Sequence, residues 1–311
     1  MDVIYLDFEN FKKNNNPIVA AIGQFDGLHV AHLTLIKKTI DIAKENNLKS
    51  AIFTFDPHPD FVLKKDLSNA YVTPINEKIN LLSNLGLDFM FVIKFDLNIA
   101  SIEPYDFVNN ILINNYVKEV VVGFDFSFGK FGKGKAKDIT SLSNNIIKTT
   151  IIDEIKYNEK KIGTTLVKQY LKLGKVDEVY KLLGRYYKIK GTVVEGNKVG
   201  RTLNLPTANL KVDKQFANIK PGVYAVKVNI KNIEFYGFAN LGYNPSFNES
   251  VDMVFETHIF NYSNNLYGET LEIELLSFIR DEIKFNSKEE FLNQINKDKE
   301  NVHEYLKNIL N

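Results

Sequence analysis

The chain has 311 residues, of which 44% are hydrophobic and 25% are charged, as is usual for a globular protein of about two domains. Its 15 Tyr and 23 Phe exclude a disordered chain, and 39 basic against 38 acidic residues give no support for a dedicated nucleic-acid binder. The lack of cysteine excludes disulfides, thiolate zinc sites and cysteine nucleophiles. The acidic amino terminus is unlike a secretory signal, and no apolar run approaches the roughly 18 residues of a membrane helix. We therefore expect a cytoplasmic protein without a nucleic-acid or membrane partner.

The first half of the chain alternates short apolar runs with segments of helical periodicity. We expect strands over residues 17–22, 50–55, 89–95 and 119–122, and helices over residues 29–46, 77–85 and 104–115. Strands and helices that alternate in this way are typical of an α/β domain, in which helices cover a parallel sheet.

From about residue 188 the pattern changes to short strands that alternate apolar and polar residues between Gly/Asn turns. The expected strands are residues 223–230, 234–241, 253–260 and 270–278. This pattern favours an antiparallel barrel. Residues 287–310 return to a helical period, with Ser287 and Glu290 spaced as a capping box, and predict a helix that closes the barrel. An apolar face of this helix would contain Phe291, Ile295, Val302, Leu306 and Leu310. The change near residues 183–188 divides the chain into domains 1–184 and 185–311.

A glycine-bearing turn, GQFDGLHVAH at residues 23–32, follows the first expected strand and opens a helix. Gly23 and Gly27 let the backbone turn sharply and approach a ligand, and the helix amino terminus suits a polyphosphate. His29 and His32, three residues apart, share one helix face and can stabilise charge during attack at phosphorus. A purely structural turn and half of a metal site remain alternatives. The metal alternative is weakened because no acidic or cysteine partner lies nearby at matching spacing.

A second glycine-bearing loop lies between residues 191 and 209. Gly196, Lys198 and Gly200 can bring backbone N–H groups and a cation to a polyphosphate. Thr207 and Asn209 supply uncharged oxygens of the kind that Mg²⁺ prefers. A hairpin turn would explain the Gly-Asn-Lys run equally well.

The motifs of both halves resemble those of the bacterial bifunctional riboflavin kinase/FAD synthetase family. In the first half, residues 23–32 resemble the G-x-F-D-G-x-H-x-G-H signature, residues 55–59 resemble F-x-P-H-P, residues 121–134 resemble V-G-x-D-F-x-F-G-x-x-x-x-G, and residues 162–168 stand in place of I-S-S-T-x-I-R. In the second half, residues 191–210 resemble G-T-V-x-x-G-x-x-x-G-R-T-x-x-x-P-T-A-N-L, residues 236–247 resemble G-x-x-N-x-G-x-x-P-T-F, residues 256–268 resemble E-T-H-I-F…L-Y-G, and residues 280–285 resemble R-x-E-x-K-F. The resemblance covers nearly the whole chain in consistent order.

The first half departs from the family pattern at four positions. Ala31 and Gly163 replace Gly and Ser, and Thr164 and Lys168 replace Ser and Arg. Lys168 keeps the charge of Arg but not its bidentate fork, and Gly163 removes a hydroxyl donor. These departures bear on the adenylyl-transfer half.

The resemblance implies a Rossmann-like nucleotidyltransferase domain followed by a barrel-shaped riboflavin kinase domain. The kinase would phosphorylate riboflavin with ATP to give FMN, and the first domain would transfer AMP from a second ATP to FMN, giving FAD and pyrophosphate. Glu256 would act as the general base of the kinase, and His29 and His32 as the electrostatic stabilisers of adenylyl transfer. The resemblance implies nucleotide-binding roles for Gly23, Phe25, Asp26, Gly27, Gly123, Asp125, Gly129, Thr164, Thr165, Lys168, Gly191, Gly196, Lys198, Gly200 and Arg201. It implies flavin contacts for Pro57, Pro59 and Arg280, and a Mg²⁺ site at Thr207 and Asn209.

Two other functions are compatible with parts of the sequence. Gly163 and Lys168 fit a monofunctional riboflavin kinase with a degenerate nucleotide-binding first domain. A non-enzymatic flavin- or nucleotide-binding regulator is the second, but the set of Thr207, Asn209 and Glu256 speaks against it, because binding alone needs no base. The oligomeric state is left open.

Overall fold

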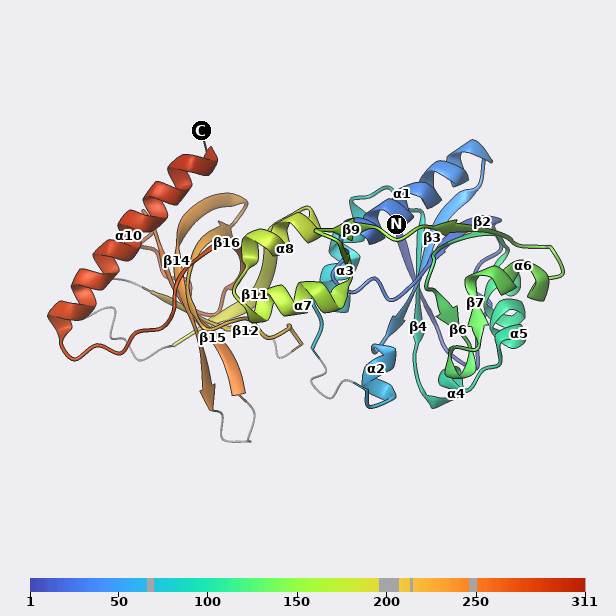
Figure 1. Cartoon of the computed structure of the whole chain (residues 1–311), viewed down its shortest axis with the longest axis horizontal. Coiled ribbons are helices and arrows are strands. Elements are labelled where there is room, and N and C mark those ends of the chain that lie inside the picture. Colours follow the sequence, from blue (N-terminus) through green and yellow to red (C-terminus); the bar gives the residue numbers. More distant parts are fainter. Residues whose placement is uncertain (66–69, 196–206, 213–214, 246–250, 311) are drawn as a thin grey trace. The chain divides into compact units, whose positions relative to one another are not determined.

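The computed structural model divides into two compact units, Met1–Thr164 and Thr165–Asn311 (Figure 1). The residues that it describes are 1–65, 70–195, 207–212, 215–245 and 251–310. The division lies earlier in the chain than the expected boundary at residues 184/185. Helix α8 (Val176–Leu183) contacts strands β11 (Tyr187–Val194) and β16 (Thr270–Arg280), so the segment before residue 184 groups with the second unit.

The first unit contains a six-stranded parallel sheet. Its strands are β1 (Asp2–Leu6), β2 (Ile18–Ile22), β3 (Lys49–Asp56), β4 (Phe89–Lys94), β5 (Val117–Gly123) and β8 (Lys148–Ile152). Their order in the sheet is β1-β4-β3-β2-β5-β8, and every neighbouring pair is parallel. The main helices are α1 (Val30–Glu45), α2 (Pro59–Val62), α3 (Ile75–Ser83), α4 (Leu97–Ala100), α5 (Pro104–Asp106) and α6 (Ile139–Leu142). The predicted parallel α/β domain is confirmed.

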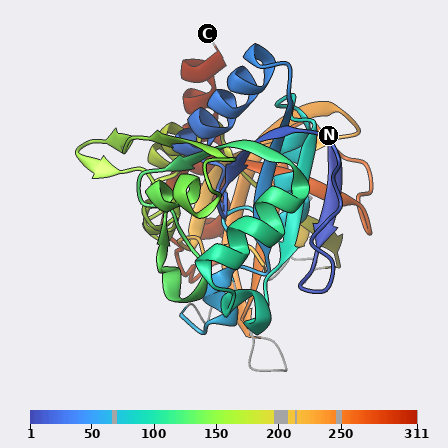
Figure 2. The same ribbon diagram turned by 90° about the vertical axis from the view of Figure 1, so that its right-hand side faces the viewer.

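Helices cover both faces of this sheet. Alternate residues of the central strands belong to two separate apolar clusters, because successive side chains of a strand point to opposite faces. One cluster contains Leu35, Ile36 and Ile40 of α1. The other contains Phe107 and Ile111 of the helical stretch that follows β4, so the two helices lie on opposite sides of the sheet (Figure 2).

The expected strands and helices of the first half are all present, with shifted ends. The helix expected over residues 104–115 is a continuous stretch of three kinds of helix: α5, the π-helical η1 (Phe107–Leu112) and the 3₁₀-helical η2 (Ile113–Asn115). Strands β1 and β8 at the two edges of the sheet were not expected. Two short hairpins complete the unit, β6 (Ser127–Phe128) with β7 (Gly134–Lys135), and β9 (Lys156–Tyr157) with β10 (Lys160–Lys161).

The second unit is a closed antiparallel barrel preceded by two helices. Helices α7 (Thr164–Lys172) and α8 lead into β11, and the later strands are β12 (Ala208–Val212), β13 (Gly222–Ile230), β14 (Ile233–Pro245), β15 (Val251–Ile259) and β16. The strands close in the order β11-β12-β15-β14-β13-β16, and β16 also pairs with β11. The predicted barrel is therefore confirmed, and each strand expected from residue 223 onward is found in it.

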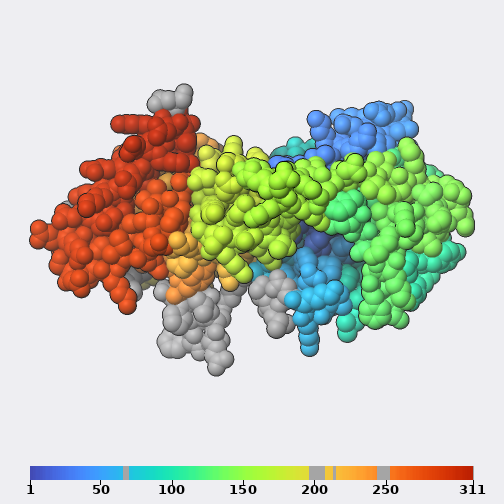
Figure 3. Space-filling model, viewed as in Figure 1, coloured from blue at the N-terminus to red at the C-terminus, as the bar shows by residue number. Residues whose placement is uncertain are grey.

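Helix α10 (Lys288–Leu310) packs against the barrel, as predicted. Its amino terminus is capped by the Ser287 hydroxyl, which accepts from the Glu290 N–H at 3.1 Å, while the Glu290 carboxylate accepts from the Asn286 N–H at 2.9 Å. Three residues of the expected apolar face, Ile295, Val302 and Leu306, are buried, and Phe291 is partly buried. Leu310 is 60% exposed, because the helix continues beyond its last core contact at Leu306. The exposed side of α10 forms part of the surface shown in red in Figure 3. Among the described residues, no helix is both long and apolar enough to cross a membrane.

Candidate active sites

The order of the strands places two of the predicted motifs at the carboxyl ends of β2 and β5, which are neighbouring central strands of the first sheet. The chain runs from β2 through β3 to β4 on one side, and then continues into β5 on the other side of β2. In open α/β sheets, ligands bind beyond the carboxyl ends of the strands at such a reversal of direction. The turn after β2 begins at Gly23, and β5 ends at Gly123, so both motifs flank the expected ligand crevice.

The backbone of the turn after β2 adopts a conformation that favours glycine at several positions. Phe25, Gly27 and Leu28 have φ angles of 53°, 85° and 43°, in the left-handed region. The Phe25 side chain is fully buried, and a Cβ at Gly23 would lie 3.2 Å from its ring. The buried Phe25 ring, which packs against Gly23, therefore anchors the turn to the core of the first unit.

The two predicted histidines lie together at the amino terminus of α1. The Nδ1 atom of His29 accepts from the His32 N–H at 3.3 Å, which caps the helix. The two rings stack with centroids 3.6 Å apart and an interplanar angle of 15°. Burial lowers the pKa of His32 well below 6.5, and the neighbouring His29, Lys78 and Lys161 lower it further, so His32 is neutral at pH 7.

Asp26 faces the protein interior and not the surface of the turn. Its carboxylate accepts from the N–H groups of Val72 and Thr73 at 3.2 and 2.8 Å, and it is 1% exposed. The Thr164 hydroxyl donates to the Asp26 carbonyl at 2.9 Å, which brings the last predicted motif of the first half to the turn. Thr165 and Lys168 lie further along α7, in the second unit.

The segment after β5 carries the remaining predicted nucleotide residues of the first unit. Asp125 is exposed and pairs with Lys161, whose ammonium also lies 5.0 Å from the centroid of the Phe124 ring. Gly129 has a φ angle of 69°, and a Cβ there would lie 2.8 Å from the Pro104 nitrogen. Only glycine fits this position without a shift of the backbone.

The predicted flavin-contacting prolines flank His58 after β3. The Asp56–Pro57 peptide bond is cis, and Pro59 begins α2. The Tyr71 hydroxyl accepts from the His58 N–H at 3.0 Å and donates to the Asp56 carboxylate at 3.1 Å. Tyr71 therefore holds the loop that contains both prolines.

In the barrel, the predicted base lies in a row of polar residues across three strands. Glu256 on β15 is directly opposite Asn209 on β12 and Asn240 on β14. Residues opposite each other on paired strands share a face of the sheet. Glu256 is exposed, whereas its neighbours Phe255 and Thr257 are buried, so this face is open to a ligand. Partial loss of solvation raises the pKa of Glu256 above its usual 4.5.

The side chains of the residues predicted to hold Mg²⁺ carry oxygen atoms of the kind that a hard cation prefers. Thr207 lies just before β12, and Asn209 is opposite Glu256 on β15. Within the described ranges, no group of three His, Cys, Asp or Glu residues forms a metal site by itself. Gly191 lies on β11, where a Cβ would be 2.9 Å from the Lys211 carbonyl oxygen. The predicted residues Gly196, Lys198, Gly200 and Arg201 lie outside the part of the chain that the structure describes.

Arg280, predicted to contact flavin, holds α10 on the barrel. Its Nε and Nη2 atoms each donate to the fully buried Asp298 carboxylate at 2.8 Å. Its Nη1 atom donates to the Asp281 carbonyl at 2.9 Å, and Gln294 also donates to Asp298, at 3.0 Å. The guanidinium is therefore committed to the packing of the helix in this state of the protein.

Comparisons with known proteins divide the chain in the same way. The family model for FAD synthetase matches residues 11–166, and that for riboflavin kinase matches residues 183–306. A bifunctional riboflavin kinase/FMN adenylyltransferase from Listeria monocytogenes is 37% identical over 93% of this chain and 92% of its own length. The chain belongs to the bifunctional riboflavin kinase/FMN adenylyltransferase family.

Other members of the family are similar over nearly their whole length. The Bacillus subtilis member is 36% identical over 96% of this chain and 95% of its own, and the Escherichia coli K12 member is 30% identical over 93% and 92%. A crystal structure from Streptococcus pneumoniae, described as a macrolide-efflux protein, superimposes with a TM-score of 0.89 at 28% identity, over 96% of this chain and 99% of its own. The whole two-unit chain thus has a counterpart among solved structures.

Several residues near the two sites were not predicted. Lys78 and Lys161 lower the pKa of His32. Asn240 lies opposite Glu256 on the neighbouring strand. Asp298 accepts hydrogen bonds from Arg280. Lys78 has a recognisable signal, because it falls on the apolar stripe of its helix together with Ile79 and Leu82. A lysine on a core-facing stripe indicates a buried charge with a specific partner.

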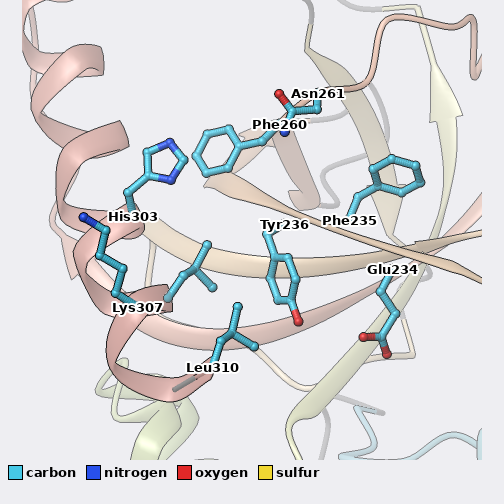
Figure 4. Close-up of a pocket in the computed structure, with 9 residues that line it drawn as sticks. Glu234, Phe235, Tyr236, Phe260, Asn261, His303, Lys307 and Leu310 are labelled. Carbon is cyan, nitrogen blue, oxygen red and sulfur yellow. The ribbon is translucent and has the colours of Figure 1, made fainter.

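A separate hollow of about 490 Å³ lies between α10, strand β14 and the residues that directly follow β15 (Figure 4). Tyr236 and Phe260 form part of its wall, and the Phe260 ring stacks on His303 with centroids 4.6 Å apart. Along the chain, Tyr236 lies four residues before Asn240, and Phe260 lies four residues after Glu256, just beyond the end of β15. None of the predicted catalytic residues lines this hollow.

Proposed function

We propose that this chain makes FAD in two steps at two separate sites. In the first step ATP phosphorylates riboflavin to FMN, and in the second the FMN phosphate attacks the α-phosphorus of another ATP. That attack forms the new P–O bond of FAD and releases pyrophosphate. The observation that carries the proposal is the position of two chemically different sets of residues. The stacked His29 and His32 occupy a helix amino terminus at the strand-order reversal, and Glu256 stands opposite Asn209 on the barrel.

In the kinase step, Glu256 takes the proton of the riboflavin 5′-hydroxyl as the hydroxyl oxygen attacks the γ-phosphorus of ATP, and ADP leaves as the bond from that phosphorus to the bridging oxygen breaks. A carboxylate on a paired barrel strand is held rigidly, and a raised pKa makes it a stronger base than an ordinary glutamate. Thr207 and Asn209 would hold Mg²⁺, which when bound supplies charge that offsets the phosphates. Gly191, Gly196, Lys198, Gly200 and Arg201 would bind the ATP of this step.

In the adenylyl-transfer step, the protein stabilises charge and supplies no nucleophile. The turn that starts at Gly23 and the amino terminus of α1 present N–H groups and a positive dipole end to the phosphates. His29 and His32 donate to the phosphate oxygens as charge develops at phosphorus, and a neutral imidazole can still donate one hydrogen bond. Phe25, Asp26 and Gly27 give the turn its shape.

Further contacts are assigned to residues of the family motifs. The nucleotide of this step would contact Gly123, Asp125, Gly129, Thr164, Thr165 and Lys168. Pro57 and Pro59 would border the flavin ring of FMN. Arg280 would serve the kinase flavin site by fixing the position of α10 through Asp298.

The functional boundary is proposed at residues 184/185. The adenylyl-transfer region, residues 1–184, then includes Thr165 and Lys168, although their helix groups with the barrel. The kinase region comprises residues 185–311. Because both steps consume ATP, we place the protein in the cytoplasm.

One assay of the purified full chain tests this function. The protein is incubated with riboflavin, ATP and Mg²⁺, and FMN and FAD are separated chromatographically over time. We expect FMN to form first and FAD to follow. FMN without FAD would indicate a monofunctional kinase, and neither product would indicate a binding protein, so either result would overturn the proposal. A parallel incubation with FMN in place of riboflavin measures adenylyl transfer alone.

A further inference from the structure

A buried lysine stands directly beneath the turn that carries the two histidines. Lys78 of α3 is 1% exposed, and its ammonium donates to the Gln24 carbonyl at 2.6 Å and to the Thr54 hydroxyl at 3.3 Å. The Thr54 hydroxyl donates in turn to the same Gln24 carbonyl at 2.9 Å. One carbonyl of the turn is therefore held by two donors, one from α3 and one from β3.

This network fixes the turn on both sides. The side-chain amide of Gln24 donates to the Phe55 carbonyl at 3.1 Å. Phe25, which follows Gln24, is buried and has a left-handed backbone conformation. The chain from Gln24 leads without other secondary structure to His29, the cap of α1. A shift of the Gln24 carbonyl would therefore move the backbone N–H groups and the rings that face the phosphates.

Packing alone does not explain why a lysine occupies this buried position. Burial of an ammonium is unfavourable, and an apolar residue would fill the same position on the stripe of α3. Burial lowers the pKa of Lys78 to about 8, and the negative charges of Asp26 and Asp56 offset part of that effect by stabilising the charged form. The positive charge of Lys78 also lowers the pKa of His32, as do His29 and Lys161.

We propose that Lys78 is a positioning residue of the adenylyl-transfer site, which holds the Gln24 carbonyl and adds buried positive charge behind the two histidines. Lys78 is too deeply buried to touch a substrate, so it acts through the turn and through its field. The field favours the triphosphate, because charges interact more strongly in a medium of low dielectric constant than in water. The inference rests on the proposed adenylyl transfer and names a residue that serves it.

Three variants of the full chain test this role, with FAD formation from FMN, ATP and Mg²⁺ as the readout. Lys78→Met keeps the length of the side chain but loses its charge and its donor, and we expect kcat/KM for ATP to fall by up to about 100-fold. Lys78→Arg keeps the charge and a donor, and should recover most of the activity. Thr54→Val removes the hydroxyl at constant shape and should give a smaller loss. Asn76→Ala, at an exposed position of the same helix, serves as the control and should leave the rate unchanged.

The pH dependence separates this role from a purely structural one. A lysine with a pKa of about 8 loses its proton as the pH rises, so FAD formation by the parental protein should decline above pH 8. This decline should be absent in Lys78→Arg, whose guanidinium stays charged, and in Lys78→Met, whose rate stays low.

Kinase activity of the same preparations separates the possible failures. Unchanged FMN formation from riboflavin shows that the chain is intact, and circular dichroism on heating reports whether the first unit remains folded. A folded Lys78→Met protein that makes FAD at the parental rate and with the parental pH profile would refute the inference, as would an alkaline decline that persists in Lys78→Arg. If Lys78→Met or Lys78→Arg does not fold, Thr54→Val decides: a parental rate refutes the inference and a loss supports it. A parental protein that makes no FAD would instead refute the proposed function.

Discussion

The Arg280 guanidinium and the Asp298 carboxylate form a two-point ion pair that joins the last strand of the barrel to α10. Both bonds are 2.8 Å long, and the carboxylate is fully buried. Removal of one partner of a buried ion pair typically costs about 3–5 kcal/mol, and Asp298→Ala leaves the largely buried Arg280 charge without its carboxylate. We therefore expect Asp298→Ala to lower the melting temperature of the barrel by about 10 °C in scanning calorimetry.

Asp281, the residue after Arg280, provides a matched control for this loss of stability. Asp281 pairs with Lys220 at 2.6 Å, but its side chain is 71% exposed. Exposed ion pairs contribute about 0–1 kcal/mol, so Asp281→Asn should change the melting temperature little. Equal shifts for the two variants would contradict the role of Asp298 as the anchor of α10.

Glu256→Gln should abolish FMN formation, while FAD formation from supplied FMN persists. The amide cannot take the proton of the riboflavin hydroxyl, but it preserves the shape of the side chain. Rates are measured by chromatography with riboflavin or with FMN as the starting flavin. Glu269→Gln, at an exposed position before β16, is the control and should retain both activities. Equal loss of both activities in Glu256→Gln would contradict separate sites.

The acid limb of FMN formation should reflect Glu256. Desolvation raises its pKa above 4.5, and the base must be deprotonated to act. Activity is therefore present above the raised pKa and is lost as the pH falls through it. In kcat/KM for riboflavin against pH, the midpoint of the limb should lie above 4.5. A midpoint at or below 4.5 would show that Glu256 is not the group that limits the reaction.

Replacement of both histidines, His29→Ala with His32→Ala, should stop FAD synthesis and leave FMN synthesis intact. Because His29 also caps α1, the single variant His29→Asn separates the two roles. Asparagine is a good helix cap, so this variant should stay folded and still lose FAD synthesis. Thermal unfolding and the two product rates are measured together. A double variant that makes FAD at the parental rate would show that the histidines have no part in the reaction.

The fold could be predicted well from the sequence because its signals are local. Apolar runs and alternation indicated the sheet and the barrel, and the spacing of Ser287 and Glu290 indicated the start of α10. Pairings between distant segments could not be read in this way. The position of Asn209 opposite Glu256 depends on the register of β12 with β15. The match of Arg280 to a family motif does not reveal its ion-pair partner, Asp298.

The sequence indicated which residues belong to the candidate sites better than it indicated what each residue does there. Asp26 stands in the predicted motif, but its carboxylate holds two backbone N–H groups from the loop before α3. Lys78 carried a signal in the helical period, yet its partners Gln24 and Thr54 come from two other segments. Three-dimensional contacts therefore decide which residues of a motif face the ligand and which support the others.

Gly129→Ala should destabilise the first unit and reduce FAD formation. Its φ angle of 69° disfavours any residue with a Cβ, and that Cβ would also lie 2.8 Å from the Pro104 nitrogen, so the backbone must move. Gly86 provides the matched control, because its φ angle is 85° but a Cβ there meets nothing within 4 Å. Gly86→Ala should therefore cost only the left-handed strain, about 1–2 kcal/mol, and keep its FAD activity. Denaturation of the full chain should show a larger loss for Gly129→Ala, and equal losses would mean that contact with Pro104 does not constrain the loop.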